Sequence, residues 1–194
     1  MSPSPSQQRL LRRVGERVLA LDTTLDVAVA TTPTPRLDPV LRALTRSADH
    51  SGLWFATSLA LALGGGAAGR RAAADGLLAV AAASATTNLV AKQVFPRRRP
   101  PAQLCHGQRH PARAVARPAS SSFPSGHAAS AFAFAGAAGR ELPALTVPLH
   151  LLAALVAYSR VHCAVHYPLD VLAGAAVGAT AGAVISRARA ARRR

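Results

Sequence analysis

The chain has 194 residues, half of them hydrophobic and 4% aromatic, with 23 Lys and Arg against 8 Asp and Glu, for a net charge of +15. This apolar content excludes a disordered basic tail, because disordered segments are poor in hydrophobic residues. The length indicates one domain, and the charge is typical of proteins that meet nucleic acid, an anionic membrane surface or a phosphorylated substrate. Two cysteines are too few for a disulfide framework.

Residues 1–51 form a polar, interrupted segment. Within residues 9–30, apolar side chains at i, i+3 and i+4 spacing predict an amphipathic helix. Residues 37–50 predict a second short helix that lies at the membrane interface. The first of these stretches, residues 9–30, has no long uncharged core, so it is neither a clear signal peptide nor a clear transmembrane helix.

After residue 51 the pattern changes to uncharged apolar blocks rich in Gly, Ala, Ser and Thr, which suit close helix packing in lipid. A spanning helix needs about 20 mostly apolar residues. We therefore predict an all-α integral membrane bundle of about five transmembrane helices, preceded by one or two short amphipathic helices. The alternative is a soluble Ala-rich bundle. The predicted spans are 52–69, 76–91, 128–139, 142–158 and 171–186.

The predicted organisation is an N-terminal segment (1–51), a membrane domain (52–187) and a basic tail (188–194). Counting hairpins places the long loop 93–123 and the loop 160–169 on one membrane face, together with the chain before residue 52. The connections 70–75 and 140–143 and the tail fall on the other face. A loop as long as 93–123 is usually functional or disordered.

Three polar clusters lie on the first face, at residues 92–100, 124–127 and 159–170. Ionisable residues at the edge of a membrane domain are costly, so they indicate function. Lys92 and Arg99 supply positive charge for phosphate oxygens, and Arg160 adds a forked contact. Ser125 and Gly126 precede a helix whose free N–H groups and dipole favour an anion.

The histidines of these clusters complete a pattern that fits phosphoryl transfer. His166 and Asp170 are spaced i, i+4 and share a helix face, so Asp170 can hold one ring nitrogen while the other attacks phosphorus. His127 is then free to protonate the leaving group.

The same clusters resemble the signature of the type 2 phosphatidic acid phosphatase family, K-x6-R-P, P-S-G-H and S-R-x5-H-x3-D. They match, in order and at every motif position, as Lys92 to Pro100, Pro124 to His127, and Ser159 to Asp170. The resemblance covers roughly residues 52–187 and leaves the N-terminal segment outside.

The resemblance implies a metal-independent, cofactor-free phosphomonoester or pyrophosphate hydrolase acting on a lipid phosphate. It implies that His166 becomes transiently phosphorylated, that Asp170 orients it and that His127 is the general acid. It also implies a set of phosphate-binding residues: Lys92, Arg99, Ser125, Gly126 and Arg160. The substrate stays open among phosphatidic acid, phosphatidylglycerol phosphate and polyprenyl phosphates or pyrophosphates, including a phosphorylated sugar on a polyprenyl carrier.

Several other interpretations stay open. A non-enzymatic basic membrane protein that binds anionic lipids or nucleic acid would explain the charge, although no recognition module for nucleic acid is visible. A vanadate-dependent haloperoxidase has a similar pocket. Zinc ligation is conceivable at Cys105, His106 and His110, or at His162, Cys163 and His166. Arg97, Arg98 and the arginine-rich tail read as contacts to anionic lipid.

Two arguments give opposite predictions for the side of the membrane on which the motif face lies. The motif face carries 15 of the 23 cationic residues, which by the positive-inside rule would place it in the cytoplasm. The family resemblance favours an extracytoplasmic site, and we follow the resemblance. The sequence says nothing about oligomeric state.

Overall fold

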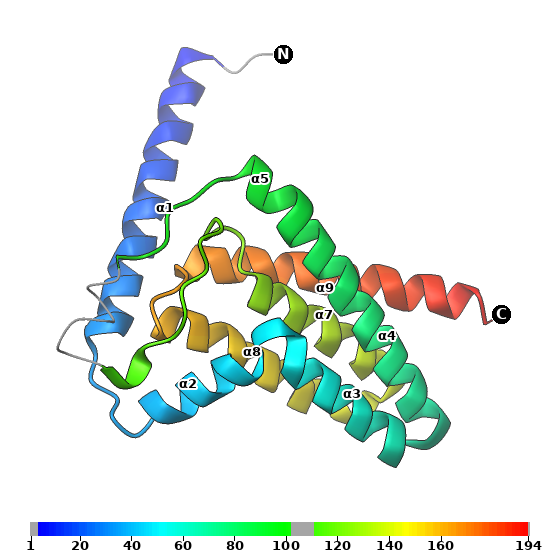
Figure 1. Cartoon of the computed structure of the whole chain (residues 1–194). Coiled ribbons are helices and arrows are strands. Elements are labelled where there is room, and N and C mark those ends of the chain that lie inside the picture. The colour runs from blue at the N-terminus through cyan, green and yellow to red at the C-terminus, as the bar shows by residue number, and fades with distance from the viewer. Residues whose placement is uncertain (1–3, 102–110, 194) are drawn as a thin grey trace.

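The computed structural model describes residues 4–101 and 111–193, and within these ranges all regular structure is helical (Figure 1). This confirms the predicted fold class at the level of an all-α protein. The longer helices are α1 (Pro5–Thr31), α2 (Asp38–Ser47), α3 (Gly52–Gly64), α4 (Gly66–Ala85), α7 (Gly126–Glu141), α8 (Thr146–His162) and α9 (Pro168–Ala191). Short elements are η1 (Asp49–Ser51), the π-helical η2 (Thr86–Ala91), α5 (Lys92–Val94), η3 (Pro111–Arg113) and η4 (Pro143–Leu145).

Three stretches of the described chain are long and apolar enough to cross a membrane, namely Gly66–Val94, Pro143–His162 and Pro168–Ala191. They contain the predicted spans 76–91 and 171–186, and all of 142–158 except its first residue. The predicted span 128–139 falls in α7, which has 16 residues, and the span 52–69 covers α3, with 13 residues, together with the first residues of α4. Both α3 and α7 are shorter than the ~20 residues that a bilayer requires. The count of five transmembrane helices therefore stays a prediction.

The connection predicted at residues 70–75 was misplaced. The chain reverses at Gly65 and Gly66, where Gly66 has a φ of +58° that favours glycine. The helix α4 therefore begins before Arg70. A side chain at Gly69 would lie 2.0 Å from the carbonyl oxygen of Leu61, so this glycine lets α3 and α4 pack as a tight hairpin.

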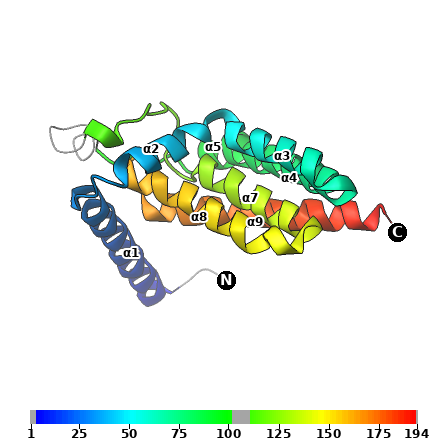
Figure 2. The same cartoon turned by 90° about the horizontal axis from the view of Figure 1, so that it is seen from below.

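The centre of the bundle is α7, which lies among α4, α8 and α9 in both views (Figures 1 and 2). Its buried residues are mostly alanines. The facing side of α9 carries Gly174, Gly178 and Gly182, whose added Cβ atoms would lie 2.3, 2.2 and 2.9 Å from α7 carbonyl oxygens. Small residues at this spacing allow two helix backbones to approach closely.

The two ends of the bundle bring together the segments that hairpin counting predicted. At one end the loop after α5 contacts the loop after α8, as Arg99 Nη1 donates to the Val165 carbonyl at 2.8 Å. At the other end Arg71 pairs with Glu141 at 2.7 Å, and Arg189 from the tail end of α9 pairs with Asp75 at 2.8 Å.

The N-terminal helix α1 extends away from the bundle, and only its later part packs against it (Figure 2). Its buried residues are Asp22, Asp26 and Ala30. Its first half is exposed, apolar side chains such as Leu10 and Leu11 included. At 27 residues it is longer than the short helix expected, whereas α2 has 10.

The close approach of α9 to α7 makes Gly178 a sensitive position. We expect Gly178→Ala to lower the free energy of unfolding by about 1–3 kcal/mol, because the new methyl group would meet the Ala129 carbonyl oxygen and the Ala133 nitrogen. Thermal unfolding in detergent measures this loss. The matched control is Gly136→Ala, since a Cβ there only reaches ordinary contact with Gly182. Equal stability of the two variants would contradict the packing described.

Candidate active site

A cavity of about 210 Å³ opens at the end of the bundle where α5, α7, α8 and the loops meet. Six of the eight predicted site residues line it, and Asn88 and Ser120 join them. The six are Lys92, Arg99, Gly126, His127, Arg160 and His166. The two others, Ser125 and Asp170, are buried immediately behind this cavity. The structure thus brings together the three clusters that the sequence separates.

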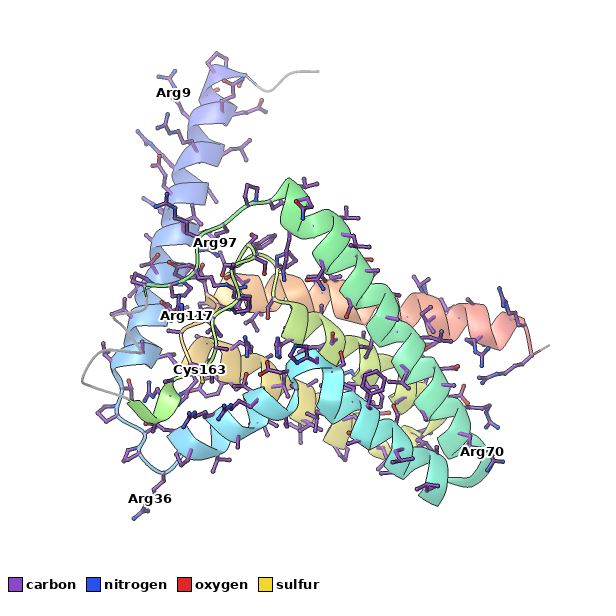
Figure 3. The ribbon with its side chains drawn as sticks, in the orientation of Figure 1. Arg9, Arg36, Arg70, Arg97, Arg117 and Cys163 are labelled. Carbon is purple, nitrogen blue, oxygen red and sulfur yellow. The ribbon has the colours of Figure 1, made fainter. Side chains whose placement is uncertain are left out.

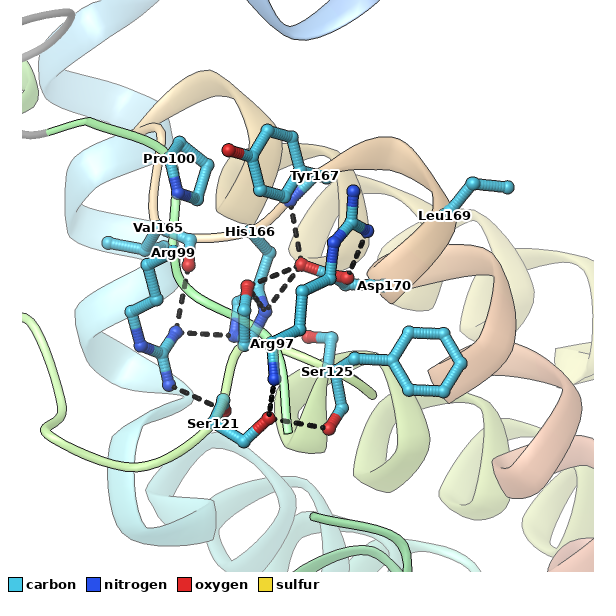
Figure 4. Close-up of polar contacts among 12 residues, drawn as sticks. Arg97, Arg99, Pro100, Ser121, Ser125, Val165, His166, Tyr167, Leu169 and Asp170 are labelled. Atoms are coloured by element: carbon cyan, nitrogen blue, oxygen red, sulfur yellow. Dashed lines mark hydrogen bonds and ion pairs between the residues drawn. The ribbon is translucent and has the colours of Figure 1, made fainter. Parts of the chain in front are cut away.

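His166 lies beside Asp170, but not on a shared helix face as the i, i+4 spacing predicted, because His166 precedes the first turn of α9 and Asp170 lies within it. Figure 4 shows the contacts of both residues. The Nδ1 atom of His166 is 3.6 Å from Asp170 Oδ2 and 3.5 Å from Ser122 Oγ. Asp170 Oδ2 also accepts hydrogen bonds from the Ser122 hydroxyl and from the Tyr167 backbone nitrogen. The carboxylate is therefore fixed on the side of the ring away from Arg99.

The other ring nitrogen, His166 Nε2, is 3.1 Å from Arg99 Nη1. Burial lowers the pKa of His166 to about 3, although Asp170 acts in the opposite direction. The imidazole is therefore neutral at pH 7 and keeps a lone pair. Arg99 is fixed by backbone carbonyls of Pro118, Ser120 and Ser121.

Lys92 follows directly on the π-helical turn η2, and π turns inside helices are frequent at functional sites. Its Nζ donates to Asn88 Oδ1 at 2.8 Å. A Cβ added to Gly126 would lie 4.0 Å from Lys92 Nζ. The ammonium group thus faces the first turn of α7, where backbone N–H groups are free to meet an anion.

Ser125 is the N-cap of α7, as its hydroxyl accepts from the Ala128 nitrogen at 3.5 Å. Its own nitrogen donates to the Asp170 carbonyl at 2.8 Å, which joins the first turns of α7 and α9. A phosphate-binding role for Ser125 stays a prediction.

Arg160 is buried at the end of α8, and its Nη1 donates to Thr45 of α2 at 2.6 Å. Its Nε has no hydrogen-bond partner within the described part of the chain. His127, on the first turn of α7, is 2.9 Å from Asp49 through its Nε2. Both contacts come from the N-terminal segment, and neither Thr45 nor Asp49 was singled out from the sequence.

The interpretation of Arg97 as a lipid contact was wrong. Its guanidinium binds Asp170 at 2.7 Å and Asp22 at 2.6 Å, and it stacks over the Tyr167 ring at 4.1 Å. Arg97 therefore links α1 to the carboxylate behind His166. The sequence held one signal for this pairing, namely the scarcity of acidic residues, because the few carboxylates each have many arginines with which to pair.

The arginines differ in where their side chains lie. In Figure 3 the side chains of Arg97 and Arg117 lie over the bundle end, whereas Arg9, Arg36 and Arg70 point outward from the periphery.

The sequence offered two possible sets of zinc ligands, and they have different outcomes. Cys105, His106 and His110 lie outside the described residues. In the second set, His162 Nε2 is 2.9 Å from Asp38, which also binds the buried Arg113. Across residues 4–101 and 111–193 no group of three or more His, Cys, Asp or Glu is arranged to hold a metal.

Apolar helices surround a cationic cavity that is lined by His127 and His166, among other residues. These features indicate an all-helical membrane protein whose candidate site lies at helix ends. The chain belongs to the PAP2 superfamily, whose family model matches residues 73–194.

The chain is also similar to a curated bacterial phosphatase. The chain is 45% identical over 82 residues to the decaprenylphosphoryl-5-phosphoribose phosphatase of Mycobacterium tuberculosis, over 39% of this chain and 43% of that protein. The chain thus spans less than half the length of the curated relatives it matches.

Two crystal structures share the fold. A transmembrane PAP2-type phosphatidylglycerolphosphate phosphatase from Bacillus subtilis superposes with a TM-score of 0.65 at 22% identity, over 87% of this chain and 84% of that one. Aquifex aeolicus LpxE superposes with a TM-score of 0.64 at 25% identity, over 84% and 93%.

The position of Arg97 between two buried carboxylates leads to a stability prediction. We expect Arg97→Gln to lower the free energy of unfolding by about 3 kcal/mol, since it leaves Asp22 and Asp170 buried without their cation. Thermal unfolding tests this, with Arg98→Gln as the control, because Arg98 is exposed and forms no ion pair among the described residues. Equal losses in the two variants would refute the bridging role.

Proposed function

We propose that this protein is an integral membrane phosphatase that hydrolyses a lipid phosphate through a phosphohistidine intermediate. The observation that carries the proposal is the cavity in which a neutral, carboxylate-backed His166 and a second histidine, His127, meet Lys92, Arg99 and Arg160. The family membership supports hydrolysis of phosphate esters.

In the proposed first step, His166 Nε2 attacks phosphorus while the ester P–O bond breaks, and His127 gives a proton to the leaving oxygen. Asp170 holds the Nδ1 proton of His166. Lys92, Arg99, Arg160 and the first turn of α7 stabilise the charge on the phosphoryl oxygens. In the second step water attacks phosphorus, His127 takes its proton, and the P–N bond breaks to restore His166 and release inorganic phosphate.

For the substrate we propose a polyprenyl phosphate that carries a polar, phosphorylated head group. The decaprenylphosphoryl-5-phosphoribose phosphatase activity of the mycobacterial relative supports this class. A second cavity of about 820 Å³ adjoins the site and shares Lys92 and Arg99 with it, and Arg97 and Arg98 add to its lining. Such a cationic space suits a head group larger than a bare phosphate.

The mechanism is tested by phosphate release from lipid phosphates in detergent with EDTA present. We expect His166→Ala to lower kcat at least about 1000-fold through loss of the nucleophile, and His127→Ala to lower it about 100- to 10000-fold through loss of the acid. Glu16→Gln, on the exposed part of α1, serves as the control and should leave kcat unchanged. Full turnover in His166→Ala would exclude the phosphohistidine route and favour a protein that only binds anionic lipid.

We also propose that the site faces the extracytoplasmic side, as the family resemblance indicates. In a variant with Cys105 and Cys163 replaced by Ser, we expect Ser120→Cys to react with a membrane-impermeant maleimide in intact cells. Ala144→Cys, exposed at the opposite end of the bundle, should react only after lysis. The reverse labelling pattern would place the site in the cytoplasm.

A further inference from the structure

Asp49 brings a carboxylate to the histidine proposed as the general acid. Its Oδ1 lies 2.9 Å from His127 Nε2. Asp49 belongs to η1, between α2 and α3, and so lies outside both the residues that the family model matches and the three motif clusters. The contact therefore joins the N-terminal segment to the first turn of α7.

The backbone after Asp49 takes an uncommon path. His50 and Ser51 have φ values of 52° and 63°, in the left-handed region that non-glycine residues rarely adopt. Non-glycine residues are strained in this region, so the rest of the structure must hold them there. Both residues line the same cavity as His127. The turn thus directs η1 toward the site.

The charges around His127 act mostly against a protonated ring. The pKa of His127 is lowered by burial and by two nearby cations, Arg160 of α8 and Lys92 of α5. Asp49 of η1 raises this pKa, but the net shift is downward. The hydrogen bond from His127 in turn holds the pKa of Asp49 below its usual range. A general acid must carry its proton when the leaving oxygen departs, and Asp49 is the carboxylate that favours the protonated ring.

We propose that Asp49 is a positioning residue that holds His127 through its Nε2–H and stabilises the imidazolium, so that Nδ1–H faces the leaving group. The inference rests on the proposed phosphatase function. As the ester P–O bond breaks and the P–N bond to His166 forms, the Nδ1 proton moves to the leaving oxygen while Asp49 stays ionised. The proton returns to His127 from the water that hydrolyses the phosphohistidine.

Substrates with different leaving groups distinguish a positioning role of Asp49 from a purely structural one. An alkyl oxygen needs the proton, whereas p-nitrophenolate departs readily without it. We expect Asp49→Asn to lower kcat/KM about 10- to 100-fold for phosphatidic acid in mixed micelles, part of the full effect of a general acid. For p-nitrophenyl phosphate we expect a loss of less than about threefold, as for His127→Ala.

The pH profile gives a second readout. Without the carboxylate the pKa of His127 falls, so a smaller fraction of the ring is protonated at any given pH, and the alkaline limb for phosphatidic acid should move to lower pH. Asp49→Glu, which keeps a carboxylate, should retain much of the wild-type profile. In a His127→Ala background, Asp49→Asn should cause no further loss, because the two residues act as one unit.

The inference would be overturned if Asp49→Asn lost equal kcat/KM on both substrates and kept the alkaline limb of its pH profile, since Asp49 would then be a structural residue. Unchanged activity in Asp49→Asn would also overturn the inference. A titration of His127 by nuclear magnetic resonance, with labelled histidine and no substrate, tests the pair without turnover. We expect the pKa of His127 to fall in Asp49→Asn, and an unmoved value would also overturn the inference. A wild-type protein that releases phosphate from neither phosphatidic acid nor a polyprenyl phosphate would instead refute the proposed function, whatever that titration shows.

Discussion

The close contact between α9 and α7 is the constraint on which the rest of the site depends. At Gly174 an added side chain would lie 2.3 Å from the Ser125 carbonyl oxygen, so only glycine permits this approach. The same approach lets the Ser125 nitrogen reach the Asp170 carbonyl at 2.8 Å. The first turns of the two helices are thereby joined, and the histidines next to them, His127 and His166, line one cavity.

A small number of carboxylates organises this strongly cationic end of the bundle. Buried cations need partners, because desolvation of a charge costs more than a single contact returns. Asp170 and Asp22 neutralise Arg97, Asp38 neutralises Arg113, and Asp49 meets His127. Three of these four acids come from the segment before α3. That segment therefore belongs to the architecture of the site, although the family model begins at residue 73.

The site divides into an inner and an outer layer of different origin. The inner layer comes from the motif clusters, which lie at helix ends and in the loops next to them and whose residues have fixed spacings along the chain. The outer layer comes from Thr45, Asp49, Asp22 and Arg97, which join it through contacts between segments distant in sequence. Through these contacts the outer layer meets Arg160, His127 and Asp170 of the inner layer.

The sequence alone determined the helical class and the grouping of loops at each end, and it predicted candidate site residues, six of which the fold brings to one cavity. The length of apolar blocks and the spacing of residues within a motif cluster are local properties, so they can be read along the chain. The turn at Gly65 and Gly66, the role of Arg97 and the partner of His127 were decided only by the tertiary structure. A run of three arginines does not show which one will meet a carboxylate, because Asp22 lies 75 residues from Arg97. Such pairings depend on how the helices pack, and here that packing follows from the glycines of α9.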